Sequence, residues 1–266
     1  MAGTLNDIAP VFRGAVSVRE GLMDAHFEAS SGIDKARQAA AHRAAGLVKD
    51  GMTIGLGSGR ASAAAIRELG ERLKRGELSF TGVPTSEPSR KLALELGIRL
   101  VEPDAVDRLD LTLDGADESD RRLNVIKGGG GALVREKLLA RSSDRLILMI
   151  EAPKQVERLG GFHLPIAVIP FAWRSTAKRA LKYCREARLR ERDGKTFITD
   201  DGLYILDLDT GPIEDPARLE QLLSCEVGVC EVGLFIGMCD QMIIGHEDGS
   251  VTEQQREAGN TREQQE

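Results

Sequence analysis

Short apolar runs alternate with longer amphipathic segments over residues 31–163 of the chain. Apolar runs of this kind are typical of strands buried in a parallel sheet, and the longer segments repeat at helical spacing. The predicted strands are 52–56, 79–83, 98–101, 109–113 and 146–150, and the predicted helices are 34–49, 61–75, 87–96 and 132–141. This order of elements predicts an α/β domain with a doubly wound parallel sheet.

A different order of elements follows over residues 164–235. The predicted strands are 166–169, 196–199, 204–208 and 229–232, and the predicted helices are 175–188 and one that Asp215 caps with Pro216 at its first position. The order β-α-β-β-α-β predicts a small ferredoxin-like α+β domain. The remaining predicted segments are an N-terminal extension at 1–30, a return to the first domain at 236–252 and a polar acidic tail at 253–266.

Composition and charge exclude several classes of partner. Aromatic residues make up 4% of the 266 residues, which argues against a stacking platform for single-stranded nucleic acid. The net charge of −6 gives no reason to expect a polyanionic partner. No apolar run approaches the roughly 20 residues of a membrane helix, and the N-terminus lacks the basic flank and apolar run of a leader peptide. We therefore expect a cytoplasmic protein without a nucleic-acid or membrane partner.

The cysteines and histidines do not predict a metal site. Cys184, Cys225, Cys230 and Cys239 form no C-x-x-C pair, and we interpret them as buried thiols in a reducing compartment. The four histidines are scattered along the chain, at positions 26, 42, 163 and 246. This spacing is not typical of metal ligands, so no metal is predicted.

The stretch 110–137 carries the strongest candidate chemistry. Asp114 and Asp117 follow a predicted strand, and ligands bind at that edge of an open parallel sheet. Lys127 is followed by four glycines, whose backbone N–H groups can approach a ligand closely, and Glu136 falls in the second turn of the next predicted helix. The alternative, surface charges around a flexible loop, does not explain glycines placed between a lysine and a glutamate.

Two other loops at strand ends are weaker candidates. The loop 55–60 opens a predicted helix, so its N–H groups could hold a phosphate, or it could simply be a tight turn. It fits the dinucleotide-binding pattern G-x-G-x-x-G poorly, because Arg60 and Ser62 occupy the two possible positions of the third glycine. Thr85 and Ser86 supply hydroxyl groups at a second strand end, where a helix cap explains them equally well.

The segment DGADESDRRLNVIKGGGGALVREK closely resembles the signature of ribose-5-phosphate isomerase, type A. Further resemblance runs through EAPKQVERLGGFHLPIAVIP, ITDDGLYILDL and GLFIGMCDQMIIGHEDGSV, and covers roughly residues 34–252. It implies a Rossmann-like domain with a smaller α/β lid, a homodimer or homotetramer, and no metal or cofactor. The implied reaction interconverts ribose 5-phosphate and ribulose 5-phosphate in the non-oxidative pentose phosphate pathway.

The same resemblance implies roles for individual residues. Glu136 would move the proton between C2 and C1, and Asp114 and Asp117 would hold sugar hydroxyls and assist ring opening. Lys127 would stabilise the enediolate oxygen, together with N–H groups of the following glycines. The implied substrate-binding residues are Ser58, Gly59, Arg60, Ala61, Ser86, Gly115, Ala116, Gly128, Gly129, Gly130 and Lys154.

The sequence departs from the family around the phosphate. Many members carry G-T-G-S-T, whereas residues 57–61 read G-S-G-R-A. We favour a role for Arg60 as a charge-assisted fork on the phosphate, and the alternative is that it points outwards. Lys35 or Arg37 could serve as a further basic residue. These differences keep open an isomerase of another sugar phosphate and a non-catalytic sugar-phosphate sensor.

Overall fold

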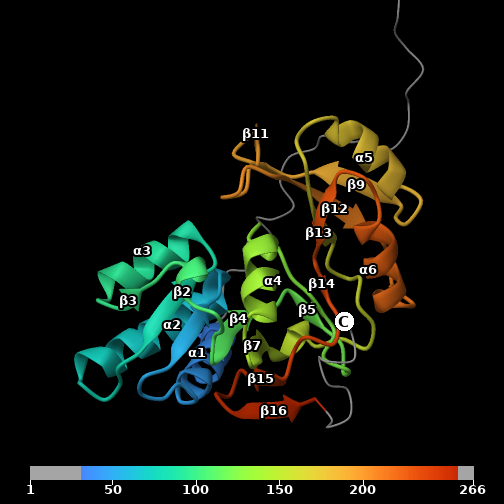
Figure 1. The fold of residues 1–266 in the computed structure, drawn as a ribbon. Coiled ribbons are helices and arrows are strands. Elements are labelled where there is room, and N and C mark those ends of the chain that lie inside the picture. Colours follow the sequence, from blue (N-terminus) through green and yellow to red (C-terminus); the bar gives the residue numbers. More distant parts are fainter. Residues whose placement is uncertain (1–30, 257–266) are drawn as a thin grey trace, which may run out of the picture.

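The computed structural model of the protein describes residues 31–256 (Figure 1). The predicted N-terminal extension, 1–30, and the end of the predicted tail, 257–266, lie outside the described residues. Within the described range, no helix has both the length and the apolar character needed to cross a membrane.

A seven-stranded sheet is the largest element of the fold, with the strand order β16-β15-β7-β4-β1-β2-β3. Its strands are β1 (Thr53–Leu56), β2 (Thr81–Pro84), β3 (Arg99–Leu100), β4 (Leu111–Gly115), β7 (Leu146–Glu151), β15 (Gln241–Gly245) and β16 (Val251–Gln255). All neighbours pair in parallel except β16, which pairs antiparallel with β15. The helices are α1 (Ser31–Ala45), α2 (Gly59–Lys74), α3 (Glu87–Glu95) and α4 (Leu133–Arg141). The predicted Rossmann-like α/β fold with a mainly parallel sheet is confirmed.

Small side chains bring the first two helices close to each other and to the sheet. The buried core between them contains alanines of both helices, including Ala40, Ala41 and Ala44 of α1 and Ala64 and Ala65 of α2. Alanine adds no side-chain volume beyond its methyl group and has the highest helix propensity, so it suits a helix that must pack tightly on two neighbours. This packing fixes the position of the α2 N-terminus at the carboxyl end of the sheet.

A four-stranded antiparallel sheet forms a second lobe beside α4 (Figure 1). Its elements are β8 (Leu164–Val168), α5 (Trp173–Ala180), β9 (Glu186–Leu189), β12 (Tyr204–Asp209), α6 (Pro216–Ser224) and β13 (Val229–Val232). The strand order β13-β8-β12-β9 and the chain order β-α-β-β-α-β are those of a ferredoxin-like unit. Asp215 caps α6 as expected, because its side chain accepts a hydrogen bond from the backbone N–H of Arg218 at 3.0 Å.

Two predicted elements of this lobe are wrong. The helix predicted at 175–188 ends at Ala180, and the residues Glu186–Leu189 form the strand β9. The strand predicted at 196–199 does not belong to the four-stranded sheet. Instead, the short strands β10 (Glu191–Arg192) and β11 (Lys195–Thr196) form a hairpin around Asp193 and Gly194, which both take positive φ angles. This turn explains the error, because the chain reverses before the predicted strand begins.

A third, three-stranded sheet was not predicted from the sequence. Its strands are β5 (Glu118–Ser119), β6 (Val125–Ile126) and β14 (Leu234–Phe235), in the order β14-β6-β5. Strands of two residues leave no periodic signal, and β14 reaches β6 from more than 100 positions along the chain. The pairing places Lys127, which directly follows β6, against Gly233, whose carbonyl accepts a hydrogen bond from the Lys127 N–H at 2.8 Å.

The cysteines only partly match their interpretation as buried thiols. All four are free, and Cys239 is buried, but Cys225 and Cys230 are exposed and Cys184 is half-buried. Cys225 lies at the C-cap of α6, and Cys230 lies at an exposed position of β13, which explains their exposure. The prediction is therefore wrong for these two residues.

Candidate active site

Asp114 occupies the carboxyl end of β4 and is 1% exposed. Its Oδ1 accepts three hydrogen bonds, from the Ser58 N–H at 3.0 Å, the Ser62 hydroxyl at 2.9 Å and the Gly115 N–H at 2.8 Å. These donors come from the start of α2 and from β4 itself, so the carboxylate joins the two elements. A buried carboxylate with three donors is held in one orientation.

Gly57 is required at its position by this carboxylate. A Cβ atom added to Gly57 would lie 2.1 Å from Oδ1 of Asp114, far inside van der Waals contact. The loop from β1 to α2 can therefore pass Asp114 only with a glycine at this point.

Lys127 lies at the centre of the buried charges. Its Nζ donates a hydrogen bond to the Gly115 carbonyl at 2.6 Å and lies 2.9 Å from Oδ2 of Asp114 and 3.2 Å from Oε2 of Glu136. Burial opposes the charge of the ammonium group, but the carboxylates of Asp114 and Glu136 outweigh it and raise the pKa of Lys127 above its ordinary value. The neighbouring carboxylates therefore favour the charged form of the lysine.

Glu136 faces the same interior. It lies in the first turn of α4 rather than the second, because the helix begins at Leu133, one residue later than predicted, and it is 5% exposed. Burial favours the neutral acid, and although Lys127 acts in the opposite direction, the negative charges of Asp114 and Asp117 reinforce burial. The net effect raises the pKa of Glu136 to about 8. A carboxylate of this kind is a stronger base than one in water.

The two carboxylates retain capacity for a ligand. Asp114 Oδ2 and Glu136 Oε2 are buried and touch Lys127 as ion pairs, but among the described residues neither atom has a hydrogen-bond partner. Buried acceptors without a hydrogen-bond partner are rare and require an explanation. Hydroxyl groups of a bound ligand would supply the missing donors.

The glycine-rich turn lies next to Asp117. Oδ2 of Asp117 accepts a hydrogen bond from the Gly129 N–H at 2.8 Å, and the Gly131 N–H closes the turn on the Gly128 carbonyl at 2.9 Å. Gly130, at the tip of the turn, is exposed. Asp114, Asp117, Lys127, Glu136 and the glycines therefore meet at one place, as the sequence predicted.

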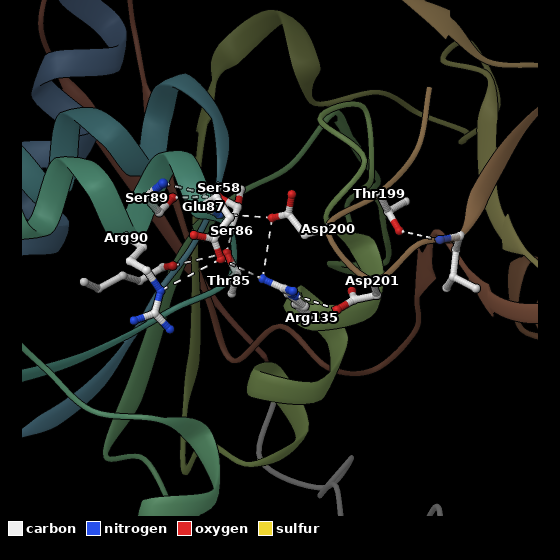
Figure 2. A network of polar contacts seen from close by, with 12 residues as sticks. Ser58, Thr85, Ser86, Glu87, Ser89, Arg90, Arg135, Thr199, Asp200 and Asp201 are labelled. Atoms are coloured by element: carbon white, nitrogen blue, oxygen red, sulfur yellow. Dashed lines mark hydrogen bonds and ion pairs between the residues drawn. The ribbon is translucent and has the colours of Figure 1, made fainter. Parts of the chain in front are cut away.

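Ser58 and Ser86 belong to a hydroxyl network at the ends of β1 and β2, seen in Figure 2. The hydroxyl groups of Ser58 and Thr85 lie 2.7 Å apart, and the Ser89 hydroxyl donates to the Gly57 carbonyl at 2.6 Å. Ser86 is the N-cap of α3, since its Oγ accepts from the Ser89 N–H at 3.3 Å. The helix cap, one of the two roles considered for Ser86, is therefore present. Ser86 is linked to the loop between β1 and α2 through Ser89, whose hydroxyl bonds to the Gly57 carbonyl.

The start of α2 presents its N-terminus at the same edge. Ser58 is the N-cap residue, but its side chain does not bond to the helix backbone, and Gly59 has a φ of +85°. Arg60 is exposed in the first turn, whereas the Ala61 side chain is buried. The structure thus does not join Arg60 to the buried residues of the site.

Lys154 is held beside the site by a line of charges. Its Nζ donates to the Ala116 carbonyl at 2.9 Å and lies 2.9 Å from Oε2 of Glu151. Oε1 of Glu151 accepts in turn from Nε of Arg37 at 2.6 Å. Burial of Glu151 raises the pKa of its carboxyl group, but the positive charges of Lys154 and Arg37 outweigh burial, and the net effect lowers this pKa. Arg37, a candidate phosphate ligand from its sequence position, is therefore buried in an ion pair.

Some residues of the site were not predicted. Ser62 is the only buried polar side chain of α2, and this departure from an otherwise apolar face was a signal that could have found it. Phe235 is fully buried, and its ring lies 5.5 Å from Nζ of Lys127 and 4.9 Å from Nζ of Lys137. It lies in the unpredicted strand β14, so no sequence signal pointed to it. Arg190, which contacts the glycine-rich turn, was also missed.

The acidic residues of the site are not grouped as metal ligands. Between residues 31 and 256, no three or more His, Cys, Asp or Glu side chains are grouped so that they could hold a metal ion. The arrangement instead combines a buried carboxylate of raised pKa, a lysine cation and backbone N–H donors. Such a set can remove a proton next to a carbonyl group and stabilise the oxyanion that forms.

Comparisons with known proteins agree with this chemistry. Residues 81–249 match the model of the family described as ribose 5-phosphate isomerase A (phosphoriboisomerase A). The chain is 46% identical to ribose-5-phosphate isomerase A of Ruegeria sp. (strain TM1040), over 83% of this chain and 87% of the relative.

Solved structures give the same result. A D-ribose-5-phosphate isomerase in complex with phospho-erythronic acid superposes with a TM-score of 0.82 and 38% identity, over 84% of this chain and 99% of the other. Ribose 5-phosphate isomerase from Plasmodium falciparum has a TM-score of 0.81 and 34% identity, over 85% of this chain and 100% of the other. The fold is thus that of a sugar-phosphate isomerase with a Rossmann-like sheet. The chain belongs to the ribose 5-phosphate isomerase A family.

Proposed function

We propose that this protein interconverts D-ribose 5-phosphate and D-ribulose 5-phosphate, with Glu136 as the base that moves the proton. The observation that carries the assignment of the base is its geometry. Glu136 is buried, has a raised pKa, and lies 3.2 Å from the Lys127 ammonium with one oxygen lacking a hydrogen-bond partner among the described residues.

The reaction needs one base and one site for negative charge. In the open-chain aldose, the carboxylate of Glu136 takes the C2 proton, the C–H electrons form the C1–C2 double bond, and the carbonyl electrons move onto O1. Returning the proton to C1 and transferring the C2 hydroxyl proton to O1 gives the ketose, with no net change in atoms or electrons. The developing charge is stabilised by Lys127 and by the N–H group of Gly130, since one donor of this kind is worth about 3–4 kcal/mol in comparable sites.

Asp114 and Asp117 are assigned to the sugar hydroxyls and to ring opening. Asp114 Oδ2 has no hydrogen-bond donor of its own among the described residues, and it shares Lys127 with Glu136. A hydroxyl donor would therefore complete its hydrogen bonding. Asp117 is half-buried and accepts a hydrogen bond from the Gly129 N–H, so a second carboxylate lies at the glycine-rich turn.

The phosphate is assigned to the N-terminus of α2 and to Arg60. The helix has 16 residues, and the Ser58 side chain leaves its first N–H groups uncapped. Uncapped N–H groups and the helix dipole favour an anion at this end. Arg60 is exposed in the first turn and could add a fork of two donors to a phosphate. Lys154, whose Nζ bonds to the Ala116 carbonyl, could add a single donor.

The family also leads us to infer a homodimer or homotetramer located in the cytoplasm. Light scattering after size-exclusion chromatography of the full chain tests the assembly, and a monomeric mass contradicts it. Fractionation of the source cells tests the location.

One assay tests the proposed function. The protein is incubated with ribose 5-phosphate without added metal, and ketose formation is followed by NMR. We expect turnover in the wild type, its loss in Glu136→Gln with binding of phospho-erythronic acid retained, and normal turnover in the exposed control variant Glu95→Gln. Binding without turnover in the wild type would favour a sensor, and turnover of only another phosphorylated aldose would favour a different isomerase.

A further inference from the structure

Arg190 joins the four-stranded sheet to the glycine-rich turn of the active site. It directly follows β9, and its side chain is 4% exposed. Its Nη1 donates hydrogen bonds to two consecutive backbone carbonyls, of Gly128 at 2.8 Å and of Gly129 at 3.1 Å. A cation from one lobe of the molecule therefore holds the backbone of a turn in the other.

Asp207 fixes the guanidinium group in this orientation. Nε of Arg190 donates to Oδ2 of Asp207 at 2.8 Å, and Nη2 donates to Oδ1. Asp207 lies on β12, the strand next to β9, and its side chain is 14% exposed. The two-pronged pair neutralises a buried charge and leaves Nη1 for the carbonyls, which a lysine at this position could not do.

Holding the carbonyls also aims the N–H groups of the turn. A trans peptide is planar, and its C=O and N–H point in opposite directions. Because the Gly128 carbonyl accepts a hydrogen bond from Arg190, the Gly129 N–H of the same peptide points away from Arg190. It donates to Asp117 at 2.8 Å. Because the Gly129 carbonyl accepts a hydrogen bond from Arg190, the N–H of the same peptide, that of Gly130, points away from Arg190. Within residues 31–256 this N–H meets no acceptor.

Phe197 supports the turn from the same lobe. Gly131 has a φ of +87°, and a Cβ atom added there would lie 2.3 Å from an edge carbon of the Phe197 ring. The centre of the Arg190 guanidinium lies 5.9 Å from the centroid of that ring. Arg190 and Phe197, which lie outside the turn, thus contact three of its four glycines, Gly128, Gly129 and Gly131.

We propose that Arg190, oriented by Asp207, is a positioning residue that sets the N–H donor of Gly130 for the enediolate oxygen and keeps the Gly129 N–H on Asp117. This inference rests on the proposed function. A hydrogen bond from a guanidinium to a peptide carbonyl also polarises the peptide, which makes its N–H a stronger donor. The second lobe therefore contributes to the chemistry although Arg190 does not touch the substrate.

The test compares Arg190→Lys and Arg190→Met with the wild type and with a control, Arg188→Met. Arg188 is an arginine of the same strand, paired with Glu186 rather than with the turn. In the Arg190 variants we expect kcat for ribose 5-phosphate to fall about 100-fold, as for groups displaced by about 1 Å. The KM should change less than about threefold, because a displaced donor costs mainly transition-state binding. Arg188→Met should keep normal kcat.

A structural role alone would give another result. It predicts lower melting temperatures with an unchanged kcat in the folded fraction, and a kcat of folded Arg190→Lys within twofold of the wild type would overturn the proposal. If the Arg190 variants do not fold, Asp207→Asn, which keeps the guanidinium but loosens its orientation, is measured in the same way. If the wild type itself is inactive, the proposed function fails. In that case, amide hydrogen exchange of residues 128–131 tests the positioning role by itself. Exchange rates in Arg190→Lys equal to those of the wild type would overturn that role.

Discussion

The Oε2 atom of Glu136 lies 3.2 Å from the Nζ atom of Lys127, and both side chains are almost fully buried. The pair forms across the turn between β6 and α4, with Asp114 on the other side of the lysine. Two buried carboxylates then share one lysine, and burial, reinforced by the negative charge of Asp114, keeps the pKa of Glu136 high although Lys127 acts against it. This relationship brings the pKa of Glu136, the base that we propose, close to neutral pH.

The pH dependence of kcat/KM should report this base. Glu136 must be ionised to accept a proton, so kcat/KM is expected to rise with pH and to level off above an apparent pKa near 8. Initial rates with ribose 5-phosphate between pH 5 and 9.5, at about constant ionic strength, measure the profile. An ascending limb near pH 4.5, the ordinary value for a glutamate, would show that Glu136 is not perturbed in this way.

Ionisation of the buried Glu136 should also lower the free energy of unfolding as the pH rises. An unfolded Glu136 ionises above pH 4.5, whereas the folded one keeps its proton up to about pH 8. The folded state then binds more protons between these values, so the contribution of Glu136 to the free energy of unfolding falls as pH rises through this window. We expect Glu136→Gln to be more stable than the wild type at pH 7 by about 1–3 kcal/mol.

Urea unfolding at pH 5 and pH 7.5 measures this difference. The gain in Glu136→Gln should be larger at the higher pH, whereas Glu95→Gln, an exposed control, should show no such trend. A variant that is less stable than the wild type at both pH values would contradict the pKa assigned to Glu136.

Gly57→Ala is expected to damage the site. The added methyl group would lie 2.1 Å from Oδ1 of Asp114, so either the β1–α2 loop or the carboxylate must move. We expect a loss of stability of about 2 kcal/mol and a fall in kcat/KM of at least about 100-fold. Gly46→Ala is the control, since its nearest contact is 3.3 Å and lies away from the site. Activity and stability of Gly57→Ala equal to those of Gly46→Ala would contradict the close approach.

Arg60→Gln tests the assignment of the phosphate. If the guanidinium binds the phosphate, its removal should raise the KM for ribose 5-phosphate about tenfold and leave kcat nearly unchanged, because the contact is the same in ground and transition states. Arg67→Gln, an exposed arginine of the same helix, should keep the normal KM. A KM of Arg60→Gln equal to that of Arg67→Gln would mean that the α2 backbone binds the phosphate without Arg60.

The sequence predicted the centre of the site because its residues are close along the chain. Asp114, Asp117, Lys127 and Glu136 fall within one stretch that runs from a strand end through a glycine-rich turn into a helix, and each of these signals is local. The alternation of strands and helices predicted the large sheet for the same reason. Local signals were sufficient where neighbours in sequence are neighbours in space.

The missed features depend on distant pairing. Phe235 reaches Lys127 through two-residue strands, and Arg190 reaches Gly128 from 62 positions away. The pattern that predicted a helix over 175–188 also fits the short alternating strand β9, and only the sheet decides between them. Arg190 looks like any surface arginine until Asp207 and the turn are placed around it.

The most direct test follows the C2 hydrogen of ribose 5-phosphate in D₂O by NMR. If Glu136 moves this proton, the wild type should exchange it during turnover, and Glu136→Gln should slow its loss by at least about 1,000-fold while still binding phospho-erythronic acid. Exchange in Glu136→Gln at the rate of the wild type would contradict the role of Glu136 as the base.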